Sequence, residues 1–366
     1  MTGRHLRRQA WLPATIWLLA ATAVHAQSFV ISTVAGVGRA GFSGDGGPAA
    51  QAELNNPSGV AVGADGSLVI ADLHNQRVRK IDPRGVITTI AGDGTDGSAG
   101  DGGPAVQARL SSPYGVAVDR AGNVLVGDRG GYSVRKISPD GTISRFAGTG
   151  QRGYSGDGGP AVNAELTRVN DMKCDAQGNV YIADTGNHCI RVVDAQGTIK
   201  TVAGTGEPGY SGDGGLARTA RFNAPSALCL DAAGALYVCD FNNHCVRKVT
   251  TEGIVSTIAG TGKAGWGGDD KPATTLKLFQ PCGVAVDAQG QVYIADSGNS
   301  KIRVVRSDGT MGTVTGTGKR GYAGDGGPAN KALIAVPDLI DIDAAGNLYI
   351  AEYGSHVIRK LTRVGR

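Results

Sequence analysis

The sequence predicts an all-β protein: a six-bladed β-propeller with four antiparallel strands in each blade. One acidic position returns every 56 residues along the chain. Each copy of the repeat holds four short apolar runs separated by turn residues, and the two ends of the chain supply complementary parts of one copy. Self-similarity at a fixed period of this length is the signature of a repeat architecture. The acidic position is occupied by Asp72, Asp128, Asp184, Asp240, Asp296 and Glu352.

The third copy shows the strands of one repeat most clearly. Runs rich in β-branched and aromatic residues cover residues 167–175, 180–184, 189–193 and 198–203, and Gly, Asp and Asn separate them. Short runs bounded by such turn residues are typical of antiparallel hairpins. Each copy is therefore expected to form a four-stranded meander, in which residues 161–166 are compatible with a single helical turn.

The two ends of the chain indicate that the array closes into a ring. The chain ends soon after residues 356–361, the third strand of the sixth copy, whereas residues 29–36 match a fourth strand. An N-terminal strand that completes the last blade requires the first and last copies to touch. Radial repetition of this kind also protects sheet edges. The glycines that align the N-terminal strand with the other fourth strands are Gly36, Gly92, Gly148, Gly204, Gly260 and Gly316.

The first 26 residues differ from the repeats. Three arginines precede an apolar run over residues 11–24, which ends in a small-x-small cleavage signal. This pattern predicts a secretory signal peptide at residues 1–26 and one propeller domain over residues 27–366. The apolar run is too short for a membrane span, which needs about 20 residues. The mature protein is expected to be periplasmic or extracellular, without a membrane span.

Several segments resemble NHL repeats. Asn-His-Cys tripeptides at residues 187–189 and 243–245 stand where those repeats carry Asn-His-Leu, and residues 57–72 look like the same consensus. The glycine-rich linker at residues 153–160 is similar to bacterial NHL proteins related to the teneurin NHL domain. The resemblance covers residues 29–361 and implies the propeller fold. Functions in this family range from an amidating lyase to RNA binding and protein contacts, so the fold does not select among them.

The sequence argues against the lyase activity found in this family. The resemblance implies that zinc-binding histidines would follow the proline that opens the inner strand of a blade. None of the six residues at this position is a histidine, and the mature chain has no Gly-x-Ser-x-Gly nucleophile motif. The six residues are Ser58, Tyr114, Asn170, Ser226, Cys282 and Asp338.

Two polar residues recur in every copy. An aspartate flanked by glycines either accepts hydrogen bonds within a tight turn or binds Ca²⁺ through its oxygens, and its presence in all copies favours the structural role. An arginine lies seven residues after each repeated acid, and we expect the two side chains to form an ion pair that holds the blade together. The aspartates are Asp45, Asp101, Asp157, Asp213, Asp269 and Asp325; the arginines are Arg79, Arg135, Arg191, Arg247, Arg303 and Arg359.

Histidines and cysteines are the other possible metal ligands. Separate blades would hold the loop histidines His74, His188, His244 and His356 far apart, whereas zinc ligands must converge on one ion. We therefore expect no zinc site from them.

All six cysteines follow the predicted signal peptide, and disulfides persist in an oxidising compartment. We expect pairing, with Cys174–Cys229 and Cys239–Cys245 as candidates. A copper site at Cys239, His244 and Cys245 is the alternative.

The inner strands break the repeat in two copies. The usual sequence is Gly-Val-Ala-Val, but the third and sixth copies carry charged residues there. These blades face each other across a sixfold ring, so their polar side chains should meet at the central channel. Polar groups gathered at one cavity are typical of a binding site; alternatively, they hold water or pair with one another. The candidate ligand-binding residues are Asn170, Asp171, Lys173, Asp338 and Asp341.

The net charge and the expected export limit the classes of function that fit the sequence. The chain has 36 basic and 32 acidic residues, and removal of the three leader arginines leaves a net charge of +1. This balance disfavours nucleic acid as a partner. We expect an exported binding scaffold that recognises a protein, peptide or glycan on its loop-rich face or at the channel mouth. The alternative is a metal-assisted hydrolase or lyase, similar to lactonases, that uses Asp338 and Asp341. The sequence requires no cofactor, although Ca²⁺ remains compatible with the glycine-flanked aspartates.

Overall fold

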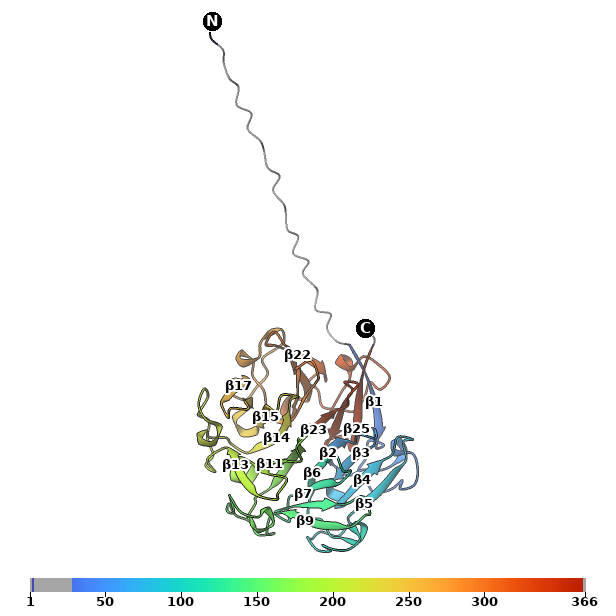
Figure 1. The fold of residues 1–366 in the computed structure, drawn as a ribbon. Helices are drawn as coiled ribbons and strands as arrows, with labels where there is room; N and C mark the ends of the chain where they lie inside the picture. The colour runs from blue at the N-terminus through green and yellow to red at the C-terminus, as the bar shows by residue number, and fades with distance from the viewer. Residues whose placement is uncertain (1, 3–27, 365–366) are drawn as a thin grey trace.

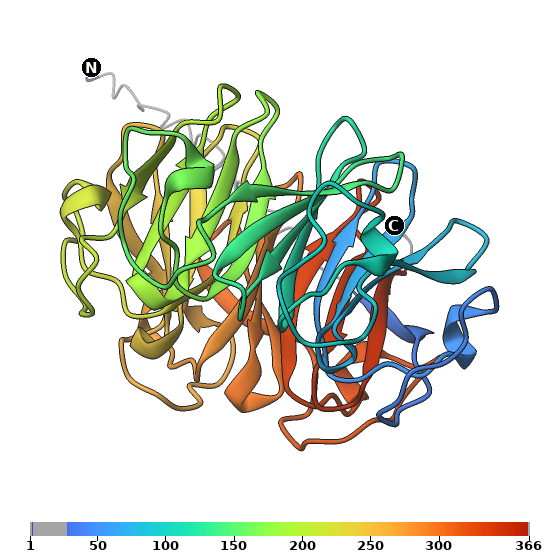
Figure 2. The same ribbon diagram turned by 90° about the horizontal axis from the view of Figure 1, so that it is seen from below.

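The computed structural model describes residues 2 and 28–364 of the 366-residue chain. The predicted signal peptide, apart from residue 2, lies outside the described residues. Six β-sheets surround a common centre (Figure 1), and a view turned by 90° shows the same sheets from the side, with loops at both ends of the strands (Figure 2). The predicted six-bladed propeller is confirmed.

The first three blades follow one another along the chain, each with its innermost strand first. The first blade consists of β2 (Pro57–Val62), β3 (Leu68–Asp72), β4 (Arg77–Ile81) and β5 (Ile87–Ala91). The second consists of β6 (Pro113–Val118), β7 (Val124–Asp128), β8 (Ser133–Ile137) and β9 (Ile143–Ala147). The third consists of β10 (Val169–Cys174), β11 (Val180–Asp184), β12 (Cys189–Val193) and β13 (Ile199–Ala203).

The last three blades complete the ring, and the fifth gains a two-residue strand at its outer edge that the repeat does not predict. The fourth blade consists of β14 (Pro225–Leu230), β15 (Leu236–Asp240), β16 (Cys245–Val249) and β17 (Val255–Ala259). The fifth consists of β19 (Pro281–Val286), β20 (Val292–Asp296), β21 (Lys301–Val305), β22 (Thr310–Thr315) and the added β18 (Lys271–Pro272). The sixth consists of β23 (Pro337–Ile342), β24 (Leu348–Glu352), β25 (Val357–Arg363) and β1 (Phe29–Ala35).

The helices are single 3-10 turns. Six of them lie in the linkers between blades, where one helical turn was expected in each repeat: η1 (Ala49–Gln51), η3 (Ala105–Gln107), η4 (Ala161–Asn163), η6 (Ala217–Thr219), η8 (Ala273–Thr275) and η10 (Ala329–Lys331). Four follow the second strand of a blade: η2 (Leu73–Asn75), η5 (Thr185–Asn187), η7 (Phe241–Asn243) and η9 (Ser297–Asn299). Among the described residues, no helix has the length and apolar character needed to cross a membrane.

The N-terminal strand closes the ring as predicted. β1 pairs antiparallel with β25, with Phe29 opposite Arg363 and Ile31 opposite Leu361. Figure 1 shows β1, in blue, beside β25, in red. The sixth blade therefore joins the two ends of the described chain, and each inner strand contacts the inner strands of both neighbouring blades.

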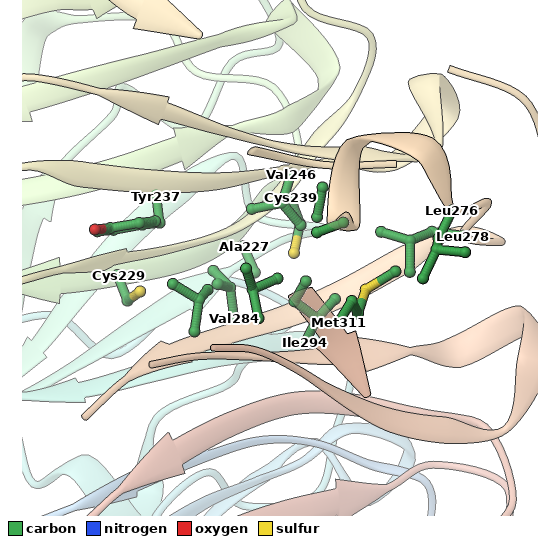
Figure 3. Close-up of a cluster of buried hydrophobic side chains, with 14 of the residues drawn as sticks. Ala227, Cys229, Tyr237, Cys239, Val246, Leu276, Leu278, Val284, Ile294 and Met311 are labelled. Carbon is green, nitrogen blue, oxygen red and sulfur yellow. The ribbon is translucent and has the colours of Figure 1, made fainter. Parts of the chain in front are cut away.

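The hydrophobic core consists of layers between adjacent blades. Figure 3 shows the layer between the fourth and fifth blades, where Cys239 and Val246 face Ile294 and Met311. Each layer draws its side chains from two neighbouring sheets. A blade can therefore bury its apolar surface only against its neighbours, which explains why the units form a closed ring.

The expected ion pairs hold every blade together, and each involves a second carboxylate. Arg79 is fully buried; its Nη1 lies 3.2 Å from Asp72 Oδ2 and its Nη2 lies 2.8 Å from Asp45 Oδ1. The other five blades repeat both contacts. The glycine-flanked aspartates thus have a structural partner in the arginines, which supports their structural role over Ca²⁺ binding.

The loop after the second strand and the linker before the blade lie on the same face. Asn75 Nδ2 donates to the carbonyl oxygen of Gly41, and Asn187 Nδ2 donates to that of Gly153. We name this side the loop-rich face.

Three loop histidines fasten one blade to the next. The Nδ1 atom of His188 accepts a hydrogen bond of 3.0 Å from the backbone N–H of Ala224, and His244 and His356 make the equivalent bond. Burial lowers the pKa of all three imidazoles. In the first blade the side chain of Gln76 accepts the corresponding bond. These histidines act as blade-to-blade acceptors in the structure.

The predicted disulfides are wrong, because all six cysteines are free. Cys239 lies opposite Val246 in the sheet and Cys245 lies opposite Asp240, so the two thiols point to opposite faces. Cys174 and Cys229 sit on neighbouring inner strands but pack into different interblade layers. Strand register therefore separates both pairs.

Candidate ligand-binding site

The inner strands place their polar residues in two layers along the central channel. The upper layer lies at the loop-rich face and is formed by the second residue of each inner strand. We name it the mouth layer. The lower layer lies three residues further along each strand. The mouth layer contains Ser58, Tyr114, Asn170, Ser226, Cys282 and Asp338, and the lower layer contains Ala61, Ala117, Lys173, Cys229, Ala285 and Asp341.

An ion pair crosses the lower layer between opposite blades. Lys173 Nζ lies 3.1 Å from Asp341 Oδ1, and both side chains are mostly buried. The other four residues of this layer are alanine or cysteine and leave room for the contact. Burial alone would lower the pKa of Lys173, but Asp341 and Asp171 raise it. The predicted juxtaposition of the third and sixth blades is thus present.

Two of the predicted acids accept hydrogen bonds from backbone N–H groups. Asp171 accepts hydrogen bonds from the N–H groups of Leu228 and Met172, at 3.1 and 2.8 Å. Asp341 uses its second oxygen to accept from the N–H of Val62 at 2.9 Å. Together with Lys173, these residues link four inner strands. This arrangement favours the alternative stated for them, that they pair locally.

The mouth layer has buried oxygens without partners. Tyr114 donates its hydroxyl to Asp338 Oδ2 at 2.6 Å across the channel. Asp338 Oδ1 and Asn170 Oδ1 are buried and have no hydrogen-bond partner among the described residues. Asp338 is 4% exposed and Asn170 is 7% exposed. Because an unpaired buried acceptor is costly, these two oxygens are the clearest places for a bound group.

Asp338 is a buried acid among polar neighbours. Burial raises its pKa to about 7, and the hydrogen bond from Tyr114 opposes that effect. The Cys282 thiol lies close enough to lower the same pKa, although its hydrogen bond goes to the carbonyl oxygen of Gln280. Burial also raises the pKa of the Cys282 thiol and of the Tyr114 hydroxyl. Neither group is activated as a nucleophile.

A cavity of about 560 Å³ opens above the mouth layer on the loop-rich face. We name it the mouth cavity. Its floor comes from four inner strands, and its walls come from the loops of the second, third and fourth blades. The floor residues are Tyr114, Asn170, Ser226 and Cys282; the wall includes Arg129, Tyr132, Arg152, Thr167, Arg168, Thr185, His188, Phe241 and Asn242.

The wall carries three arginines and no acidic residue. The guanidinium of Arg129 lies over the Tyr114 ring, 4.8 Å from its centroid. Within residues 28–364, none of Arg129, Arg152 and Arg168 forms a salt bridge. The lining of the cavity therefore carries positive charge without a salt-bridged acid, and the nearest acidic influence on Arg129 is Asp338 of the mouth layer.

The described residues do not bring enough metal-ligating side chains together to form a metal centre. No group of three His, Cys, Asp or Glu side chains there could hold an ion. Asp338 and Asp341 belong to different layers, and Asp341 faces Lys173. The two carboxylates named for a metal-assisted reaction therefore do not form one site.

Comparison with known families fits this geometry. The model for the NHL repeat matches residues 168–193, 222–249 and 280–305, and the model for the teneurin NHL domain matches residues 37–99. The chain is an NHL-repeat β-propeller. The matched segments cover the inner three strands of the third, fourth and fifth blades, and the whole first blade with its flanking linkers, in agreement with the predicted resemblance.

Relatives of this NHL propeller are much longer proteins. It is 31% identical over 270 residues to the chloroplastic protein SUPPRESSOR OF QUENCHING 1 of Arabidopsis thaliana, with 69% of this chain and 25% of that protein covered. It is 28% identical over 282 residues to teneurin-4 of Mus musculus, with 66% and 10% covered. The chain thus spans a quarter or less of both proteins.

Solved structures share the fold of the NHL propeller. A protein of unknown function from Bacteroides thetaiotaomicron has a TM-score of 0.68 at 19% identity, covering 92% of this chain and 76% of that chain. An auxiliary nutrient binding protein from the same organism has a TM-score of 0.65 at 12% identity, covering 92% and 77%. A gluconolactonase from Xanthomonas campestris has a TM-score of 0.57 at 15% identity, covering 93% and 95%.

Analysis of the inner strands alone missed the arginines of the mouth cavity. Arg129 stands where the other copies have Leu, Thr, Phe, Ser and Tyr, and Arg168 stands where they have Asn, Ser, Ala, Gln and Val. Tyr132 likewise replaces Gln, His or Ser. A comparison of every loop position across the six copies of this NHL propeller would have found these departures. Among the predicted residues, Asn170 lines the cavity and Asp338 contacts its floor through Tyr114.

Proposed function

We propose that this NHL propeller is an exported binding protein that holds its ligand in the mouth cavity. One observation carries the proposal: a cavity of about 560 Å³ is lined in part by residues at which the second and third blades depart from the repeat, such as Arg129, Arg168 and Asn170. Residues that occur once cannot be explained by the needs of a repeated blade. The volume is within the range of roughly 300–1,000 Å³ that is usual for small-molecule sites.

The unpaired oxygens support binding at this position. Asn170 lines the floor and its buried oxygen lacks a donor among the described residues, as does the second carboxylate oxygen of Asp338, which accepts from Tyr114 through the first. A ligand that donates a hydrogen bond to Asn170 would satisfy that oxygen. The fold shared with nutrient-binding propellers is consistent with a peptide, protein or glycan ligand.

Export is part of the proposal. The charged and apolar pattern of residues 1–26 supports removal of a signal peptide before folding in the periplasm or outside the cell. Mass spectrometry of the protein purified from its native host should find a mature chain that begins at Gln27. Retention of residues 1–26 would contradict export by cleavage.

The hydrolase or lyase alternative gains less support. The fold is shared with a gluconolactonase, but identity is only 15% and fold does not assign activity. Asp338 and Asp341, the carboxylates on which that alternative relied, occupy separate layers. Binding in the mouth cavity requires neither acid to act as a catalyst.

A filling substitution tests the proposed site. Asn242 lies on the cavity wall and is exposed, so Asn242→Trp should obstruct the cavity without disturbing the core. His74 holds the same repeat position in the first blade, outside the cavity, so His74→Trp is the matched control. Thermal-shift measurements over a panel of small sugars, sugar acids and peptides should show stabilisation of the wild type and of the control but not of Asn242→Trp. Equal stabilisation of all three proteins would contradict binding in this cavity.

A further inference from the structure

We infer that the mouth cavity recognises an oxyanion, a carboxylate or a phosphate, on a small polar ligand. This inference rests on the proposed function and specifies the class of ligand. It follows from the charge of the cavity, from the way Arg129 is held, and from the unpaired acceptor on the floor.

The cavity presents cations without matching acids. Arg129, Arg152 and Arg168 line it, no acidic residue does, and no salt bridge within residues 28–364 engages these three side chains. His188 adds no charge, because its Nδ1 accepts a backbone hydrogen bond and burial lowers its pKa. Guanidinium groups form paired, charge-assisted hydrogen bonds with carboxylate and phosphate oxygens. An anion is therefore the complementary ligand.

Arg129 is held in place by a chain of contacts that crosses the channel. Its guanidinium stacks 4.8 Å above the Tyr114 ring, and the Tyr114 hydroxyl donates to Asp338 at 2.6 Å. All three residues differ from their counterparts in the other copies. The arrangement positions a cation over the floor while the acid that anchors Tyr114 stays below it. Positioning of this kind reduces the entropy lost on binding.

The floor indicates what else the ligand carries. The hydroxyl group of Ser226 already donates to the backbone carbonyl oxygen of Cys282 on the next inner strand. Asn170 Oδ1 has no donor among the described residues and is buried. A ligand hydroxyl or amino group placed beside the oxyanion would supply the donor. Hydroxylated acids, such as sugar acids or sugar phosphates, satisfy both requirements.

Isothermal titration with matched probes tests the inference. Galacturonate carries a carboxylate, glucose 6-phosphate carries a phosphate, and galactose and glucose are their neutral counterparts. We expect at least one anionic probe to bind at millimolar concentration and to bind at least ~10-fold more tightly than its neutral counterpart, because hydrogen bonds between two charged groups are stronger than those between neutral groups. The two arms distinguish a carboxylate ligand from a phosphate ligand.

Two arginine substitutions and one control locate the binding. Arg129→Gln and Arg168→Gln should each weaken the anionic probe ~10-fold or more and leave the folded protein unchanged by circular dichroism. Arg320 holds the repeat position of Arg152 in the opposite linker, outside the cavity, so Arg320→Gln should bind like the wild type. Raising the salt concentration should weaken the wild type more than Arg129→Gln.

The remaining outcomes of these experiments overturn either the inference alone or the proposed function as well. The inference is overturned if neither anionic probe binds, if the neutral sugars bind as tightly, or if both arginine substitutions leave affinity unchanged. A neutral ligand whose binding is blocked by Asn242→Trp would refute the oxyanion but keep the proposed function. Anion binding that survives Asn242→Trp would refute both.

Discussion

Two sets of arginines in this propeller differ in their charged partners and in their place on the ring. The repeated set, represented by Arg191, is fully buried, and each member contacts two carboxylates of its own blade or linker. The cavity set, Arg129, Arg152 and Arg168, lies at one position on the ring, lines a cavity and has no acidic partner among the described residues. The comparison teaches that residues shared by all blades maintain the ring, whereas residues found in only one or two blades are free to serve a ligand.

The repeated set also explains most of the exposed aromatic residues of the linkers. Tyr154 covers the guanidinium of Arg191 at 5.5 Å, and Trp266 covers that of Arg303 at 4.3 Å. Phe42, Tyr210 and Tyr322 make the same contact in their blades. Contacts of this kind between a cation and an aromatic face contribute about 0.5–2 kcal/mol. The five exposed rings therefore form part of the blade structure, and their repetition is no evidence for repeated ligand sites.

The largest effect is expected from breaking a repeated ion pair. Arg191→Met would leave Asp184 buried without its cation, and removal of one partner from a buried pair costs about 3–5 kcal/mol. Arg152→Met should change the free energy of unfolding by less than ~0.5 kcal/mol, because Arg152 is exposed. Equilibrium denaturation of both variants measures the difference. Equal stability of the two would remove the distinction between the sets.

A pH titration tests the raised pKa of Asp338, the buried acid of the mouth layer. Burial raises the pKa of Asp338 from 3.8 to about 7, so between these values the folded protein binds more protons than the unfolded chain. The free energy of unfolding should then fall as pH rises from about 4 to about 7. Relative to Asp338→Asn, whose amide still accepts from Tyr114, the wild type should lose at most ~4 kcal/mol over this window.

The control for this titration is an exposed acid. Asp96 is exposed and lies away from the mouth layer in the second linker, so Asp96→Asn should run parallel to the wild type at every pH. Denaturation at intervals between pH 4 and pH 8 gives the three profiles. A constant difference between Asp338→Asn and the wild type would mean that Asp338 titrates like an ordinary surface acid.

The lower layer is expected to show a smaller, coupled effect on stability and none on binding. Lys173→Met and Asp341→Leu each remove one partner of the 3.1 Å pair, at about 1–3 kcal/mol, and the double substitution should cost less than their sum. A double-mutant cycle measures the coupling. If either single variant instead abolishes ligand binding while remaining stable, the lower layer belongs to the binding site after all.

The ring could be derived from the sequence because its evidence is repeated. A glycine position shared by six copies aligned residues 29–36 with the other fourth strands, and the observed pairing of β1 with β25 confirms it. The pairing of each arginine with the acid seven residues earlier could be foreseen because both sit on adjacent strands of one hairpin. Its second partner, such as Asp157 for Arg191, lies 34 residues away, and only the folded blade shows that the linker returns to the arginine.

The binding site could be derived only in part. Asn170 and Asp338 were identifiable because they directly precede the two inner-strand segments that depart from Gly-Val-Ala-Val, but a sequence does not show which channel layer each residue joins. Lys173 and Asp341 were therefore grouped with them, although the structure places that pair lower. Arg129 and Arg168 come from different blades, and only the folded ring shows that both line one cavity. The cysteine pairs failed for a related reason, since strand register decides which face each thiol occupies.

The smallest effect is expected from the histidines that connect blades. Two substitutions at one of them show whether its hydrogen bond or its packing stabilises the protein. His188→Ala removes the acceptor for the N–H of Ala224 and should cost about 1 kcal/mol in the free energy of unfolding. His188→Gln should recover most of this loss, because Gln76 makes the same contact at 2.7 Å from the same left-handed backbone conformation. Comparing the two variants by thermal denaturation isolates the hydrogen bond, since both keep that conformation without glycine. If glutamine and alanine destabilise the protein equally, the imidazole contributes through its packing, and the interblade bond is not what the repeated histidine supplies.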